Sequence, residues 1–307
     1  MNFSQFSYIT LSAYFDIGLL KYIVFVIIMC VFILTVSSNI LLIVVICVNR
    51  SLYEPMYMFL CSLFVNELYG SLAFFPFLLV QILSDHHTIS VPLCFLQIFI
   101  LYMYGNVEFY NLAMMSYDRY VAICYPLQYN AWMSMNMVTR LVVLTWFFPL
   151  LNVIVMISLN ASSELCGNII DRVYCANYYI TKLVCRGAVA SNIYGLVYVY
   201  TVLLGLAALI IYTYARILKV CFSGSKQTRQ KALSTCTPHL ASVINFSFGC
   251  FFEILQSRFD LSRVPNVLRI ILSIYFLTCQ PLFNPITYGF TLSKIRLTCK
   301  TLFFGKK

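Results

Sequence analysis

One short segment, Met115–Leu127, places charged and aromatic residues at the end of a long apolar run. Asp118, Arg119 and Tyr120 are adjacent there, and the apolar run before them begins near Pro92. An arginine at the end of a membrane span is costly unless it reaches water or pairs with an acid, which Asp118 offers. An acid–arginine pair that forms in one packing of the helices and breaks in another would act as a switch. The alternative is that two interfacial charges simply end a helix in the membrane.

Two further acids, Glu67 and Glu108, interrupt apolar runs near the middle of each run. An acid at that depth is costly and calls for a partner. No Lys or Arg lies at matching depth, since Arg119 follows Glu108 by eleven residues, which is about 16 Å along a helix. Two carboxylates that face each other there would share a proton or bind a cation. A protonated acid bonded to a backbone carbonyl is the remaining possibility.

The composition indicates which elements carry these residues. Of the 307 residues, 62% are hydrophobic and 10% are charged, whereas a soluble domain has about 25% charged residues. The net charge of +10 comes from short basic segments between apolar runs, not from a basic surface interleaved with aromatic residues. This pattern is typical of a membrane protein and argues against nucleic-acid binding.

Seven apolar runs are long enough to cross a bilayer, and no cleavable signal peptide precedes the first. Because lipid cannot satisfy backbone polar groups, each run must be a helix. The alternation of basic residues and Leu or Phe in Ser293–Phe304 predicts an amphipathic helix on the inner leaflet. We therefore expect one all-α domain, a seven-transmembrane helix bundle, covering residues 1–307, with spans at about 20–48, 57–82, 92–124, 140–161, 190–218, 231–256 and 265–290.

The distribution of Lys and Arg predicts the orientation. Most of the 20 basic residues lie on the inner side if the N-terminus is outside. Asn2 and Asn160 head glycosylation sequons on the predicted outer side. Four cysteines also lie on that oxidising side, where they allow three pairings that the sequence does not distinguish. They are Cys94, Cys166, Cys175 and Cys185.

Four motifs, in order along the chain, resemble those of odorant receptors, a branch of the rhodopsin-like G-protein-coupled receptors. Met115–Tyr129, MSYDRYVAICYPLQY, resembles the third-span signature, with Ser116 in place of the usual Ala. The other three are Leu52–Leu60 in the first inner loop, Lys231–Leu240 at the start of the sixth span and Pro281–Tyr288 in the seventh. The string Asn66–Ser71 is more similar to fish odorant receptors than to mammalian ones.

The resemblance implies a plasma-membrane receptor that binds a small odorant, contacts membrane lipid, requires no cofactor and activates a stimulatory, olfactory-type heterotrimeric G protein, raising cyclic AMP. Asp118 would hold Arg119 at rest, and outward movement of the sixth helix would release Arg119 for the G protein. The switch residues that the resemblance implies are Asp118, Arg119, Tyr120, Tyr214, Asn284, Pro285 and Tyr288.

The resemblance also implies pairings that the residues alone leave open. Cys94 would bond to Cys175, and Cys166 to Cys185, within the long loop between the fourth and fifth spans. The cation held by the two acids would be Na⁺. Its ligands would be Glu67, Glu108, Asn39 and Asn284.

Helical spacing suggests which residues line a ligand pocket. Two stripes follow the i, i+3, i+4, i+7 pattern of one helix face, although such stripes more often reflect helix packing. They are Tyr102, Gly105, Asn106 and Phe109 in the third span, and Phe248, Phe251, Phe252 and Leu255 in the sixth. Glu253 lies off the second stripe and is interpreted as a solvated acid. The resemblance adds Tyr198 and Val202 from the fifth span and Ile274, Leu277 and Thr278 from the seventh, giving a mostly apolar pocket.

Two other functions remain to be weighed. A transporter or channel would explain the intramembrane acids, but the odd span count and the lack of repeats argue against it. A non-olfactory receptor for a small molecule or a peptide has the same fold, and the short N-terminus argues mildly against the peptide. No serine or cysteine lies near a base in the sequence, so an enzyme is not expected.

Overall fold

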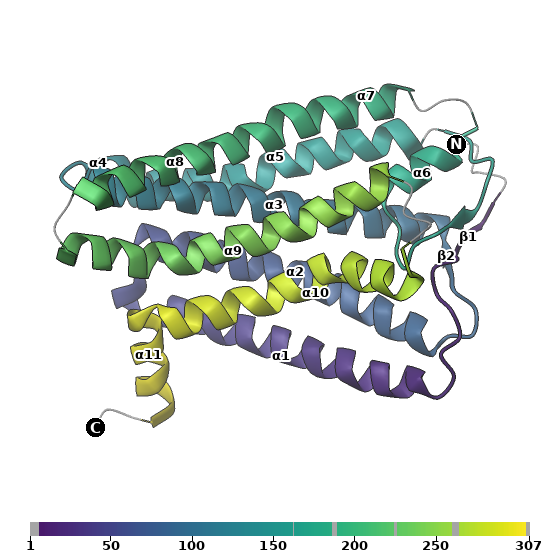
Figure 1. The fold of residues 1–307 in the computed structure, drawn as a ribbon, viewed down its shortest axis with the longest axis horizontal. Coiled ribbons are helices and arrows are strands. Elements are labelled where there is room, and N and C mark those ends of the chain that lie inside the picture. Colours follow the sequence, from purple (N-terminus) through teal and green to yellow (C-terminus); the bar gives the residue numbers. More distant parts are fainter. Residues whose placement is uncertain (1–5, 162, 186–188, 224–225, 260–263, 305–307) are drawn as a thin grey trace.

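The computed structural model describes residues 6–161, 163–185, 189–223, 226–259 and 264–304. Its long helices run side by side along one axis (Figure 1). Within these described ranges, seven helices are long and apolar enough to span a membrane, which confirms the predicted helix bundle. They are α1 (Leu20–Val48), α2 (Pro55–Leu83), α3 (Val91–Cys124), α5 (Met135–Ala161), the continuous Val189–Ser223, α9 (Lys226–Arg258) and α10 (Asn266–Thr291).

The fifth of these helices is not uniform. Its outer part α7 (Val189–Tyr198) and its inner part α8 (Leu204–Ser223) are joined by π-helical turns at Val199–Leu203. Such π-helical segments are rare and often occur at functional sites. The segment includes Val202, one of the residues expected in the ligand pocket.

Two helices begin before the spans expected from hydropathy. α5 begins at Met135 and α9 at Lys226, several residues ahead of the apolar runs. The first turn of α9, Lys226–Arg229, is polar, and the first two turns of α5 include Asn136, Thr139 and Arg140, because both lie at the inner end, where water can solvate polar groups. A hydropathy window therefore finds the membrane-embedded part of each helix and misses its first turn.

A small sheet, absent from the all-α expectation, covers the outer end of the bundle. The N-terminal strand β1 (Tyr8–Leu11) lies between β2 (Thr88–Ser90) and β3 (Ile169–Ile170). It pairs antiparallel with β2 and parallel with β3. Ile9 and Leu11 of β1 are buried among apolar residues of α3 and the outer loop. The N-terminal segment is therefore part of the outer core.

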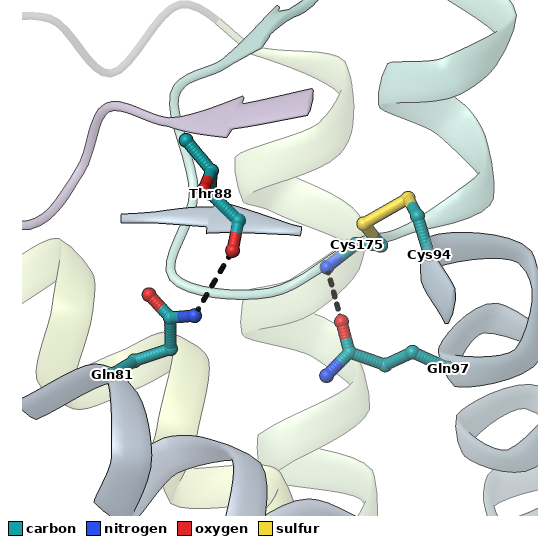
Figure 2. The surroundings of a disulfide bond; sticks show 5 residues. All are labelled: Gln81, Thr88, Cys94, Gln97 and Cys175. Carbon is teal, nitrogen blue, oxygen red and sulfur yellow. Dashed lines mark hydrogen bonds between the residues drawn. A yellow bond between two sulfur atoms is a disulfide. The ribbon is translucent and has the colours of Figure 1, made fainter. Parts of the chain in front are cut away.

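Two disulfides shape the outer loop. Cys94 at the start of α3 is bonded to Cys175 (Figure 2). Gln97, one turn further along α3, accepts a hydrogen bond from the Cys175 backbone N–H at 2.8 Å. Figure 2 also shows Gln81 donating to the Thr88 carbonyl at 3.2 Å, which fixes β2 against α2. The second disulfide, Cys166–Cys185, closes the loop around the short helix α6 (Asn177–Leu183).

The inner end carries three short helical segments, η1 (Arg50–Leu52), α4 (Tyr129–Trp132) and α11 (Ser293–Phe304). α11 turns away from α10 at a steep angle, toward the C-terminus (Figure 1). Ile295 is fully buried, whereas Lys294 points outward and pairs with Glu54 at 2.6 Å. This division between a buried and a charged side is that of a helix lying at a membrane surface.

We expect Cys175→Ser to destabilise the receptor. The disulfide closes a long loop, and loss of such a bond typically costs about 2–4 kcal/mol of unfolding free energy. Thermal unfolding of the detergent-solubilised protein should show a lower Tm. Cys30→Ser, which alters an exposed free cysteine of α1, is the control and should leave Tm unchanged. Equal Tm values for Cys175→Ser and the unaltered chain would contradict the expectation.

Candidate functional site

Two carboxylates lie close together in the middle of the bundle. Glu67 on α2 and Glu108 on α3 have no exposed surface. Asn284 on α10 donates its amide nitrogen to Oε1 of Glu108 at 2.9 Å and also to Oε1 of Glu67. Because both acids accept from the same nitrogen, their carboxylates are adjacent. The structure thus brings together three of the four residues expected to hold Na⁺.

The remaining donors to the two acids are neutral. Tyr104 donates its hydroxyl to Glu67 Oε2 at 3.1 Å. Asn66 and Gln280 donate side-chain amides to Glu108, each at 3.1 Å. None of the ion pairs between described residues includes either acid. The sequence analysis missed these three donors, although the amides of Asn66 and Gln280 lie in membrane spans and are themselves a signal.

Asn39 does not join this group, which corrects the expectation that it is a fourth ligand. Its amide nitrogen donates to the Pro281 carbonyl at 2.8 Å and to the Thr35 carbonyl at 2.9 Å. The physical reason is Pro285, which lacks an N–H and so leaves the carbonyl four residues earlier, that of Pro281, without its helical partner. Asn39 supplies that partner and joins α1 to α10.

The inner end of α3 holds the expected acid–arginine pair. Arg119 donates to Asp118 Oδ2 through Nε at 2.9 Å and through Nη2 as well. Tyr129 of α4 donates its hydroxyl to the other oxygen of Asp118 at 2.8 Å. Burial and the Asp118 carboxylate raise the pKa of Tyr129, so its phenol keeps the proton that it donates. Tyr120 lies against Tyr125 with ring centroids 5.6 Å apart.

A histidine that the sequence analysis did not place in the switch connects three helices beside this pair. His239 of α9 is bonded through Nδ1 to the hydroxyl of Tyr214 on α8. Its Nε2 lies 3.0 Å from the Leu112 carbonyl of α3. A carbonyl only accepts, so Nε2 carries the proton and Nδ1 accepts from Tyr214. Arg119, His239 and Tyr288 line one small cavity at this end.

Several residues expected in the ligand pocket do meet in the middle and outer parts of the bundle. Asn106 on α3 accepts a hydrogen bond from the Tyr198 hydroxyl of α7 at 2.5 Å. Phe109 stacks on Phe246 of α9, with ring centroids 5.7 Å apart. A side chain at Gly105 would lie 3.3 Å from the ring of Phe276. The other expected residues with partly or fully buried side chains are Tyr102, Val202, Phe252, Leu255, Ile274, Leu277 and Thr278.

The stripe chosen on the sixth span is wrong for two residues. Phe248 is 46% exposed and Phe251 is 57% exposed, so both face the surrounding lipid rather than a pocket. The inward face of α9 instead carries Ser242, Phe246 and Gly249. Lipid accepts phenylalanine as readily as a protein core does, and an aromatic stripe in a span therefore does not identify the inward face.

The outer loop adds a buried cation to this region. Arg172 is 5% exposed. It donates to Gln256 of α9, to Ser273 of α10 at 2.6 Å and to Tyr179 of α6. Glu253, expected to be solvated, lies 3.8 Å from the Arg172 guanidinium. Burial by itself lowers the pKa of Arg172. Glu253 and the neighbouring tyrosines together raise it by more, so the net pKa lies above its usual value and the guanidinium stays charged.

Asn160 is a poor glycosylation site, contrary to expectation. It lies in the last turn of α5 with no exposed surface. Its amide nitrogen, the atom that would carry the glycan, donates to Asn177 at 2.7 Å and to Thr181 at 3.2 Å. The sequon pattern carries no information on burial, which explains the error. Asn2 lies outside the described residues.

The fold is that of rhodopsin-like G-protein-coupled receptors. The structure is similar to the crystal structure of squid rhodopsin, with a TM-score of 0.75 over 94% of this chain and 82% of that chain; the sequences are 19% identical. At that identity the likeness concerns the fold alone.

The sequence comparisons specify the family. The family model described as olfactory receptor matches residues 28–306. Mouse olfactory receptor 6E1 is 38% identical, over 73% of this chain and 72% of the relative. Human olfactory receptor 10H4 is 36% identical, over 75% and 74% respectively. The chain belongs to the olfactory receptor family: it is an odorant receptor, a multi-pass plasma-membrane protein and not an enzyme. The likeness to fish receptors stays a prediction.

We expect Asn160→Gln to leave the glycan of the expressed receptor unchanged, because the native amide is buried and bonded. Gel mobility before and after treatment with peptide N-glycosidase measures the glycan. Asn2→Gln is the comparison variant and should abolish the mobility shift. A smaller shift for Asn160→Gln than for the unaltered receptor would show that the buried position does carry sugar.

Proposed function

We propose that this odorant receptor binds a small, mostly apolar odorant between the outer halves of α3, α7, α9 and α10. It then activates a stimulatory, olfactory-type heterotrimeric G protein, which raises cyclic AMP. The observation that supports the coupling is the buried Asp118–Arg119 pair at the inner end of α3. A buried pair of this kind is stable only while its surroundings are intact, and a rearrangement nearby therefore releases the arginine.

The step between ligand and G protein runs through α9. Phe246 contacts Phe109 of α3 in the pocket region, and His239 contacts the α3 backbone two turns closer to the inner end. A ligand that displaces Phe246 shifts α9 as a unit. Outward movement of its inner end breaks the bond from His239 to the Leu112 carbonyl and widens the cavity beside Arg119. The G protein then binds at that cavity.

The inner surface is suited to a second partner, the anionic lipid of the inner leaflet. Arg216 and Lys219 line an open cleft at the end of α8. Basic residues next to a span attract anionic headgroups. These two residues would keep α8 in place while α9 moves.

We expect Arg119→Ala to abolish the odorant-evoked rise in cyclic AMP, because the side chain that the G protein would contact is gone. Cells expressing the variant are compared with cells expressing the unaltered receptor at equal surface expression. Arg140→Ala removes an exposed arginine at the inner end of α5 and is the matched control. A normal cyclic AMP response from Arg119→Ala at the cell surface would refute the switch.

We further propose that Glu67 and Glu108 hold Na⁺ in the resting receptor. Two carboxylates without a basic partner among the described residues match a cation in charge, and their oxygens match it in ligand type. Bound Na⁺ would hold α2 and α3 together in the resting packing. Asn39 takes no part, because its amide is bonded to Pro281.

We expect the purified receptor to be more heat-stable in NaCl than in choline chloride at equal ionic strength. A cation that binds only the folded state adds about 2.7 kcal/mol of stability when its concentration is about 100 times its Kd. Glu108→Gln should remove this sodium dependence of Tm and alter basal cyclic AMP. A pair that holds a proton instead predicts the same Tm in both salts, and that result would exclude the sodium site.

A further inference from the structure

The cluster around Arg172 contains two buried polar atoms that lack a hydrogen-bond partner among the described residues. One is Oε2 of Glu253 and the other is Nε2 of Gln256. Glu253 Oε2 is 3.8 Å from Arg172, too far for a hydrogen bond. The Tyr174 hydroxyl lies beside the same carboxyl, but Oε2 has no partner with hydrogen-bond geometry among the described residues. Gln256 is 9% exposed, and its Oε1 is already occupied by Arg172 and by Ser273. One acceptor and one donor are therefore left without a partner, although the Glu253 side chain as a whole is 25% exposed.

These two atoms belong to neighbouring positions of one helix. Glu253 and Gln256 are three residues apart on α9, and residues with that spacing lie on the same face. Arg172 contacts both residues from the loop side. Its other bonds, to Ser273 and Tyr179, hold it in place between α6, α9 and α10.

Apolar side chains lie around this polar cluster. Val173 and Tyr174, which follow Arg172 in the outer loop, belong to a cluster of buried residues with Leu101 of α3 and Leu277 of α10. Ile274, next to Ser273 in the chain, packs against the same cluster. A ligand with its polar group at Glu253 and Gln256 would extend its hydrocarbon part among these residues.

We propose that Glu253, Gln256 and Arg172 form the subsite that recognises the head group of the odorant, and that this head group is a hydroxyl. A hydroxyl has one donor and two acceptor positions. It would donate to Glu253 Oε2 and accept from Gln256 Nε2, which satisfies both free atoms with one ligand oxygen. This inference rests on the proposed ligand site between the outer halves of the helices.

Other head groups satisfy the cluster less well. An aldehyde, a ketone or an ether only accepts, so Glu253 Oε2 keeps no partner. A carboxylate only accepts, so Glu253 Oε2 still receives no donor. A protonated amine only donates, so Gln256 Nε2 still has no acceptor. One acid and one cation balance each other here, and the two unmatched atoms therefore favour a neutral group that both donates and accepts.

The first test compares ligands that differ only in the head group. Cells expressing the full chain are given hexanol, octanol and decanol, each beside its methyl ether and the carboxylic acid of equal chain length. Cyclic AMP should respond to at least one alcohol at a concentration about tenfold or more below that of its ether, which lacks the donor to a charged acceptor. Equal potency of the ethers or acids, or no response to any alcohol, would overturn the proposal.

The second test changes the acceptor. Glu253→Gln places an amide where the carboxylate was, and an amide donates as well as accepts. The ether then gains a donor while the alcohol loses a charged acceptor, so the tenfold preference should largely disappear. A purely structural role for Glu253 would weaken both responses equally, which would contradict the subsite. Phe251→Leu, on the lipid-facing side of α9, is the matched control and should leave the preference unchanged.

Binding to the purified receptor separates this inference from the signalling proposal. Octanol should raise Tm of the detergent-solubilised receptor more than octyl methyl ether does, and Glu253→Gln should remove the difference. This measurement involves no G protein. If octanol stabilises the receptor but cyclic AMP does not rise, the coupling fails and the subsite stands. The opposite outcome is also informative. If the unaltered receptor gives a higher basal cyclic AMP level than Arg119→Ala, while octanol and octyl methyl ether raise Tm equally, the subsite fails and the coupling stands.

Discussion

The burial of two carboxylates in the membrane-spanning part of the bundle constrains the helices around them. Glu67 and Glu108 meet neutral donors from α2, α3 and α10, and each donor must lie within hydrogen-bond reach of a carboxylate. Ser242 of α9 in turn donates to the side-chain amide oxygen Oδ1 of Asn284 at 2.6 Å. A shift of any one helix along its axis would leave a polar group unpaired in lipid, which is expensive. The acids therefore fix the register of four helices.

Buried polar groups also position the inner end of the bundle, but there they are neutral. Ser242 and His239 are three residues apart on α9 and both are buried, so the inward face of this helix is polar over one turn. Within the described residues, the ion pairs that involve the inner ends of α3 and α9 are limited to Asp118–Arg119, which lies within α3. The polar link from α9 to α3 is a neutral hydrogen bond, from His239 to the Leu112 carbonyl. Such a bond exchanges at a smaller net cost than a buried ion pair. That is the property a moving helix requires.

The sequence predicted the parts of the structure that depend on the bilayer. Seven long apolar runs can only be helices in lipid. The acids Glu67 and Glu108, at mid-span depth, required either each other or another polar partner. The strand β1 could not be predicted, because its four residues pair with segments about 80 and 160 positions away and carry no length or pattern of their own. The outward position of Phe248 and Phe251 was missed for a related reason: hydrophobicity does not distinguish lipid from protein core.

Polar residues are consequently the better guide to the inward faces of this receptor. Ser242 and Gln256 mark the inward side of α9 along its length, whereas its phenylalanines occur on both sides. Arg172 extends the argument to a loop. An arginine in a loop would ordinarily be solvated, yet here it is buried against α9 and α10, and the disulfide from Cys94 to Cys175 holds the loop close enough for this to happen. The outer loop therefore completes the polar interior of the bundle. A buried cation is costly unless it is paired, and the cation that the loop contributes is matched by Glu253 of α9 and by neutral hydrogen-bond partners on α9 and α10.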